Sequence, residues 1–161
     1  MNGRAWRIGF VGFVCVWVAV VLVAQAAPDG GQAAGAPSAP QTYKGLEIAV
    51  TGFERAASVG LRDCPPGANT VRGVIKPGEV NEFATVKIDV KVLPSFKPVM
   101  LKKPVLYDQA GKAYNTAQSF ADLNSSPSYA CEFAFRVPKG TKIRRFAIES
   151  ATFDLASFES Q

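Results

Sequence analysis

The chain has 161 residues, a formal net charge of +5 at pH 7 and no histidine. Without histidine, Ser-His-Asp and Cys-His catalysis and the usual zinc and copper sites are excluded. Ser-Lys and paired-carboxylate mechanisms remain open. The mild positive charge fits either a generic soluble surface or weak attraction to anionic polymers.

The first 26 residues have the organisation of a secretory signal peptide. Arg4 and Arg7 precede an uncharged apolar run over residues 8–24, and Ala24-Gln25-Ala26 supplies the small residues of a cleavage site. The competing interpretation is an uncleaved membrane anchor, because a spanning helix needs about 17 residues or more. Either interpretation predicts an extracytoplasmic protein, secreted or periplasmic. It would contact the membrane only through residues 8–24, and only if these are retained.

Residues 27–42, APDGGQAAGAPSAPQT, are dominated by Ala, Gly, Pro and Gln. Such a segment cannot bury enough apolar area to offset the ordering of its backbone, so we predict a flexible linker. Residues 43–158 then form one domain of ordinary size with a single core. Cleavage after residue 26 would lower the net charge to +3, because Arg4 and Arg7 are the charged residues lost.

The dominant pattern within residues 43–158 has a period of two. Apolar residues alternate with polar or small ones over residues 46–50, 86–92 and 129–137, which is typical of strands with one exposed face. Turn signals separate these runs: Pro65-Pro66-Gly67, Pro77-Gly78, Asp108-Gln109-Ala110-Gly111 and Pro138-Lys139-Gly140. The pattern predicts an all-β, antiparallel sandwich or barrel.

The final strand contains a conflict of phase. Phe146 and Ile148 share a face, but the same alternation places Arg144 on that face, where an unpaired charge would be costly. We expect the strand either to begin near Arg145 or to contain a bulge at Arg144-Arg145. A second irregularity is expected near residues 150–151, because the apolar residues beyond it change face.

Two segments carry a family resemblance. The matching residues are Leu106, Asp108, Gly111 and Tyr114, which fit L-x-D-x-x-G-x-x-Y, and Phe135, Val137, Pro138 and Gly140, which fit F-x-V-P-x-G. With the valine-rich strand before them and FAIESATFDL after them, they resemble the bacterial telokin-like extracellular domains of unknown function, over residues 82–155. The resemblance implies an Ig-like β-sandwich in an exported protein and supplies no catalytic residues. The chain departs from the family at residues 93–96, Leu-Pro-Ser-Phe, where an asparagine-ended strand is usual.

The cysteines offer one candidate disulfide. Cys15 lies inside the apolar run and is interpreted as a small hydrophobe. Cys64 and Cys131 remain, and an even count in an oxidising compartment favours a bridge between them. The alternative is a buried thiol at Cys131 and an exposed one at Cys64. Tyr129-Ala130-Cys131 has the Tyr-x-Cys spacing of antibody-type domains, but residues 27–161 contain no tryptophan, which disfavours antibody-type topology.

The charged residues provide one candidate contact surface. Lys139, Lys142, Arg144 and Arg145 cluster around a turn and the start of a strand, where they could contact an anionic glycan or lipid surface. The alternative is a solvated strand rim. Nucleic-acid binding is disfavoured by export and by the lack of stacking aromatic residues beside basic ones.

Other acidic residues give no site. Glu79 and Glu82 flank the turn at residues 77–78 and are interpreted as a solvated strand edge rather than a catalytic pair. Asp108 opens a turn with too few oxygens for calcium. We therefore predict no metal and no cofactor. The expected function is that of an exported, non-catalytic binding or structural module of the cell envelope, whose partner is an unknown envelope protein or an anionic surface. The alternative is a histidine-free hydrolase that uses carboxylates or Ser/Lys.

Overall fold

The computed structural model describes residues 37–66, 73–122 and 126–159. The predicted signal or anchor over residues 1–26 and the retained-anchor alternative over residues 8–24 lie outside these ranges. Gln32–Gln161 form one compact unit. Because all described strands and the buried core belong to this unit, it has what an independently folding domain needs.

Nearly all of the regular structure is β-strand. In chain order the strands are β1 (Gln41–Tyr43), β2 (Leu46–Ala56), β3 (Val59–Gly60), β4 (Val74–Ile75), β5 (Asn81–Val92), β6 (Val99–Leu101), β7 (Val105–Asp108), β8 (Ala113–Asn115), β9 (Phe120–Asp122), β10 (Ser128–Pro138), β11 (Ile143–Ile148) and β12 (Ala151–Asp154). One short helix, α1 (Ala156–Glu159), follows them within the described residues.

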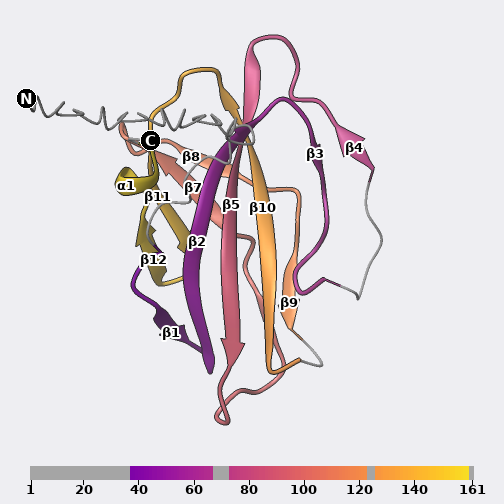
Figure 1. The fold of residues 1–161 in the computed structure, drawn as a ribbon, viewed down its shortest axis with the longest axis vertical. Coiled ribbons are helices and arrows are strands. Elements are labelled where there is room, and N and C mark those ends of the chain that lie inside the picture. The colour runs from indigo at the N-terminus through magenta and orange to yellow at the C-terminus, as the bar shows by residue number, and fades with distance from the viewer. Residues whose placement is uncertain (1–36, 67–72, 123–125, 160–161) are drawn as a thin grey trace, which may run out of the picture. The chain divides into compact units, whose positions relative to one another are not determined.

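The main strands form two four-stranded antiparallel sheets, in the orders β1-β2-β5-β10 and β12-β11-β7-β8 (Figure 1). β5 lies between β2 and β10 and pairs with both along nearly its whole length. Two smaller antiparallel pairs are β3-β4 and β6-β9, and Figure 1 draws β3, β4 and β9 on the side of β10 away from β2. The predicted antiparallel β-sandwich is confirmed, and the three runs with period two are β2, β5 and β10.

The core lies between the two main sheets. The alternation predicted for β5 and β10 is observed, because Val86, Ile88, Phe133 and Phe135 are fully buried while Asp89 is exposed. Phe146 of β11 packs between the rings of Phe133, Phe135 and Phe153, with ring centroids 6.2, 6.1 and 6.0 Å from its own. Such aromatic clusters contribute large buried apolar areas and favourable ring geometry.

One half of the outer face of β5 and β10 is not exposed, contrary to the prediction of a fully solvated face. Phe83, Thr85 and Ala134 point outward in the alternation, yet each is at most 5% exposed. Val59 and Leu61, on and after β3, pack with Phe83 and Ala134 as a second apolar cluster. The short β3-β4 pair therefore covers this half of the sheet.

The predicted bulge at the start of the last strands is present. The register of β11 against β7 shifts between Ile143 and Arg145, so that Arg144 and Arg145 are both exposed while Ile143 and Phe146 are buried. The bulge resolves the conflict that regular alternation would create by placing Arg144 in the core. The predicted second irregularity is the turn between β11 and β12, where Glu149 has a φ of 52°.

The first described residues already belong to the domain. Ser38 exchanges two hydrogen bonds with Val50, its N–H donating to the Val50 carbonyl and its Oγ accepting from the Val50 N–H. β1 begins at Gln41, whose side-chain amide accepts from Thr152 N at 3.1 Å and donates to the Thr152 carbonyl. Ordered structure therefore extends into the predicted linker, and Gln41 joins β1 to β12 at one edge of the sandwich.

Candidate functional site

The first segment that carries the family resemblance, from Leu106 to Tyr114, builds the hairpin of β7 and β8. Asp108 ends β7, and its Oδ1 accepts from the N–H groups of Ala110 and Lys112 at 2.9 and 2.8 Å. The Tyr114 hydroxyl of β8 donates to Asp108 Oδ2 at 3.0 Å, and Gly111 has a φ of 83°, which glycine adopts without strain. Desolvation opposes the charged carboxylate, but these donors together lower the pKa of Asp108. The motif is explained by turn formation.

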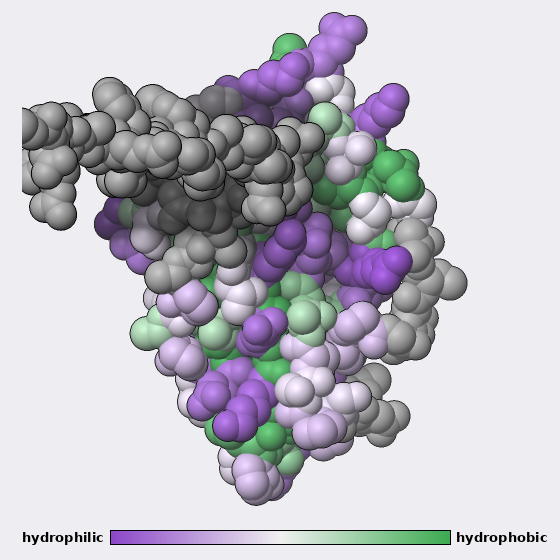
Figure 2. Space-filling model, in the orientation of Figure 1, coloured by the Kyte–Doolittle hydropathy of each residue, from purple (hydrophilic) through white to green (hydrophobic). Residues whose placement is uncertain are grey.

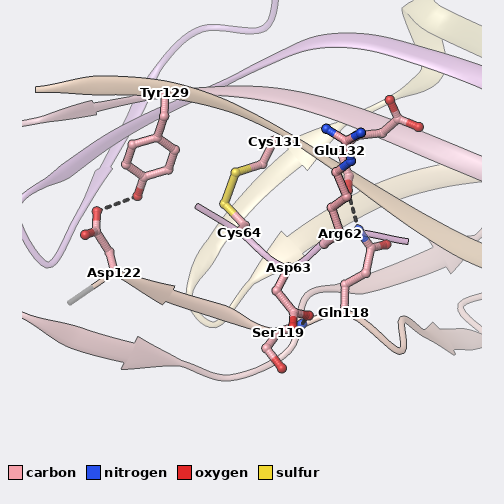
Figure 3. The surroundings of a disulfide bond; sticks show 9 residues. All are labelled: Arg62, Asp63, Cys64, Gln118, Ser119, Asp122, Tyr129, Cys131 and Glu132. Atoms are coloured by element: carbon pink, nitrogen blue, oxygen red, sulfur yellow. Dashed lines mark hydrogen bonds between the residues drawn. A yellow bond between two sulfur atoms is a disulfide. The ribbon is translucent and has the colours of Figure 1, made fainter. Parts of the chain in front are cut away.

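Cys64 and Cys131 form a disulfide whose Cα atoms are 5.7 Å apart. Figure 3 shows that it joins β10 to the segment containing Arg62 and Asp63. Cys64 also exchanges backbone hydrogen bonds with Ser119 and Ala121, each at 2.9 Å, and thus lies beside β9. The bridge therefore fixes a crossing segment to the edge of one sheet and does not join two facing strands as in antibody-type domains.

Tyr129 also differs from the corner tyrosine of antibody-type domains, in the partner of its hydroxyl group. Its hydroxyl donates to Oδ2 of the fully buried Asp122 at 2.6 Å (Figure 3). An antibody-type tyrosine bonds to the backbone instead. Burial, followed by the bond to Asp122, raises the pKa of Tyr129. The Tyr-x-Cys spacing is therefore local to this edge.

Gln118 holds the free edge of β10. Its side chain is 2% exposed; Oε1 accepts from Ala134 N at 2.7 Å, and Nε2 donates to the carbonyls of Glu132 and Arg62 at 2.5 and 2.6 Å. The amide thus bonds to β10 as a neighbouring strand would, and it also bonds to the crossing segment. Just before it, Thr116 forms an isolated bridge with Phe135 of β10, which closes the second edge of the sandwich.

A hollow of about 460 Å³ lies between the crossing segment and the outer face of the sheet. We call it the disulfide groove. The residues that line it are Thr51, Gly60, Arg62, Asp63, Pro66, Lys87, Ile88, Ala130, Cys131 and Glu132. One wall is held by the disulfide, by Gln118 and by the bond from Ser119 N to Asp63 Oδ1 at 2.6 Å. The groove is therefore open to solvent but has fixed walls.

The charges in the disulfide groove are mixed. Lys87 and Glu132 lie opposite each other in the register of β5 and β10, and the Lys87 ammonium pairs with Glu54 at 2.8 Å. The bond to Glu54 raises the pKa of Lys87 despite its partial desolvation. Desolvation is the largest cause that raises the pKa of Glu132; the Glu54 charge adds to it and Lys87 opposes it. The groove thus offers both charged donors and a carboxylate to a polar ligand.

The four predicted anionic-ligand residues have different surroundings in the structure. Arg144 pairs with Asp154 at 3.0 Å, and the Arg145 guanidinium lies 4.3 Å from the centre of the Tyr107 ring. Both arginines line a second hollow, of about 480 Å³, which also contains Asp108. Two carboxylates therefore share this hollow with the arginines and reduce its positive charge.

Lys139 and Lys142 are not among the residues that line this second hollow. Lys139 lines a third hollow, together with Glu79 and Glu82. The Glu82 carboxylate is already occupied, because it accepts from Arg55 at 2.9 Å. Lys142 is exposed on the turn between β10 and β11. The anionic-ligand role of these four residues remains a prediction, and the structure gives the two lysines and the two arginines different surroundings.

Within residues 37–66, 73–122 and 126–159, no group of three or more His, Cys, Asp or Glu side chains is arranged to hold a metal ion. In the same part of the chain, no helix has the length and hydropathy to cross a membrane.

No motif in the sequence marks Arg62, Lys87, Gln118 or Glu132 as residues of a site. The alternation places Glu132 and Lys87 on the polar faces of two strands. Whether the two side chains lie opposite each other depends on the pairing register of these strands. Gln118 carries no motif, since one amide between an alanine and a serine has no periodicity. The sequence offers a clue for Arg62 alone, because Arg62 lies two residues from Cys64 and Cys64 is expected to bond to Cys131.

The fold and the site define an antiparallel β-sandwich with a disulfide-fixed groove on one sheet. No protein-family model matches the chain, and no curated protein matches it. Among solved structures, the chain is similar to an uncharacterized beta-sandwich protein from Clostridium difficile 630, with a TM-score of 0.45 and 12% identity, over 71% of this chain and 87% of that chain. At this identity no residue role is transferred.

Proposed function

We propose that the chain is an exported, non-catalytic binding module of the cell envelope, with the Ig-like, telokin-like character that its motifs suggest. The observation that carries the proposal is the disulfide groove, an exposed hollow whose wall is fixed by a disulfide and by Gln118. Fixed walls lower the ordering cost of binding. A groove with charged groups of both signs suits a polar ligand that offers donors and acceptors together.

Export is supported by two independent features. Residues 1–26 have the pattern of a signal peptide, and Cys64 and Cys131 are bonded, which is typical of oxidising compartments. N-terminal sequencing of the protein from its native host should begin at Ala27. Intact protein that begins at Met1 in the membrane fraction would replace secretion with anchoring.

Binding is tested by capture from envelope extracts with residues 32–161 immobilised. We expect Arg62→Ala and Glu132→Gln each to abolish capture of the component that the parent domain retains. Arg136→Ala is the matched control, because Arg136 is exposed on the same strand as Glu132 but does not line the groove. Equal loss with Arg136→Ala, or capture unaffected by the groove variants, would contradict the proposal.

The hydrolase alternative is favoured by one observation, the raised pKa of Glu132 in the groove. A paired-carboxylate mechanism needs a second acidic group beside it. The groove contains Asp63, but Asp63 Oδ1 accepts from the Ser119 backbone at 2.6 Å. Hydrolysis of ester, glycoside or peptide substrates by the parent domain that disappears in Glu132→Gln would make the alternative correct and the non-catalytic proposal wrong.

A further inference from the structure

Three turns meet at one end of the sandwich. They cover residues 76–80 before β5, residues 108–112 between β7 and β8, and residues 138–142 between β10 and β11. Lys139 N donates to the Val80 carbonyl at 3.1 Å, and Gln109 N donates to the Lys142 carbonyl at 2.9 Å. The backbone thus joins the three turns into one connected surface.

Arg55 fixes the base of this surface. Its guanidinium donates to Glu82 at 2.9 Å, to the Thr141 carbonyl at 2.6 Å and to Glu159 of α1. Glu82 also accepts from Gly140 N at 3.2 Å, and Glu159 from Ile143 N at 2.9 Å. Both carboxylates are therefore hydrogen-bonded to Arg55 and to backbone donors, and the single positive charge of Arg55 compensates part of their negative charge.

The outward-facing side chains are mostly basic. Lys76, Lys139 and Lys142 are exposed, and no ion pair joins their ammonium groups to a described residue. Val80, between them, is 76% exposed, although valine is commonly buried. We call Lys76, Val80, Lys139 and Lys142 the basic rim. Figure 2 shows hydrophilic residues projecting from the upper end of the domain. Glu79 is the acidic residue exposed within the same turn as Val80.

We propose that the basic rim docks this end of the domain on an anionic lipid surface. The three ammonium groups lie over the headgroups, and Val80 enters the boundary between headgroups and acyl chains. Charge complementarity supplies the attraction, and an exposed apolar residue among lysines is the arrangement that interfacial binding uses. A soluble polyanion would use the lysines but would not need Val80. The inference rests on the proposed envelope location and names a partner for it.

The test measures binding of residues 32–161 to vesicles of equal parts phosphatidylglycerol and phosphatidylcholine, with phosphatidylcholine alone as the neutral reference. Each lysine near an anionic surface contributes about fivefold, so Lys139→Gln with Lys142→Gln should weaken binding about 25-fold. Val80→Ser should weaken it about fivefold, since the apolar contact is lost. Glu79→Gln should strengthen it about threefold, since a repulsive charge is removed. Binding of the parent should fall steeply with salt.

Matched controls lie outside the rim. Lys97→Gln with Lys102→Gln removes two exposed charges, and Met100→Ser changes an apolar residue that is 72% exposed. Both should bind as the parent does. Absence of parent binding to the anionic vesicles, or equal losses in the controls, would overturn the proposal. A third outcome would also overturn it. If the lysine variants lose binding to dextran sulfate, and Val80→Ser leaves vesicle binding unchanged, the rim is a site for polyanions and not for a lipid surface. None of these outcomes affects capture through the disulfide groove, which tests the proposed function separately.

Discussion

The core and the crossing segment over residues 59–66 are stabilised by different interactions. In the core, Phe133, Phe135 and Phe146 are fully buried, and their contacts are apolar. In the crossing segment, the fixing interactions are the Cys64–Cys131 bridge and side-chain bonds to backbone groups. Burial positions whole strands, whereas the bridge and the amide position a few atoms at the groove. The comparison indicates that the sandwich is the scaffold and the crossing segment is the part specialised for a site.

The largest loss of stability is expected from the core. Phe135→Ala should lower the free energy of unfolding by about 3–5 kcal/mol, because it loses burial and leaves a cavity beside Phe146. Glu132→Ala, three residues away with its side chain in the groove, should cost less than about 0.5 kcal/mol. Urea unfolding of both variants measures the difference. Similar losses would mean that the scaffold and the site are not energetically separate.

Breaking the disulfide tests the crossing segment directly. Cys64→Ser with Cys131→Ser removes a link that spans 67 residues of sequence, and loop-closure entropy then predicts a loss of about 4 kcal/mol. The loss arises largely from the unfolded chain, so the core should remain intact. Hydrogen exchange should accelerate at the amide of Ala121, which bonds to Cys64, before that of Val86. Uniform acceleration would contradict the division into scaffold and site.

Gln118 tests the same segment without the covalent link. Gln118→Ala removes the partners of Ala134 N–H and of the Arg62 and Glu132 carbonyls, with an expected loss of about 2–3 kcal/mol. Gln41→Ala is the matched variant, because Gln41 makes equivalent bonds to Thr152 at a more exposed edge. Water can replace those bonds, so the loss there should be below about 1 kcal/mol. Equal unfolding free energies for the two variants would show that burial of the Gln118 amide does not increase the contribution of its hydrogen bonds to stability.

The sandwich could be predicted because burial on one face leaves a period of two in the sequence. β2, β5 and β10 were recognised in this way, and the bulge near Arg144 followed from the cost of a charge in the core. The cover formed by β3 and β4 could not be predicted, since strands of two residues show no period. Its effect on Thr85 and Ala134 was therefore missed.

The candidate site was less predictable than the fold. The bond between Cys64 and Cys131 followed from their even count and the expected compartment. The groove depends on Lys87 facing Glu132, which the register of β5 and β10 decides and which no local pattern specifies. Closeness in sequence also does not decide surroundings: Lys139 and Arg145 are six positions apart but line different hollows.

The smallest effect concerns the turn at Glu149, which ties three elements by polar contacts. Tyr43 donates to its carboxylate, the Lys102 N–H donates at 2.9 Å and the Lys44 ammonium pairs at 3.1 Å. The pKa of Glu149 is lowered to about 2 from an ordinary 4.5. The hydrogen bond from Tyr43 is the largest cause, and the bond from the Lys102 N–H is the second. A lowered pKa stabilises the fold above pH 4.5, and that contribution disappears as the pH falls towards 2.

Glu149→Gln should therefore lower the free energy of unfolding by about 1 kcal/mol at pH 6, a modest value because solvent screens the pairs. Near pH 2 the variant and the parent should differ little, since the parent carboxylate is then largely protonated. Tyr43→Phe removes one donor and should give an intermediate profile. Urea unfolding between pH 2 and pH 6 measures all three proteins. A pH-independent difference between Glu149→Gln and the parent would show that the residue acts through the shape of the turn and not through its charge.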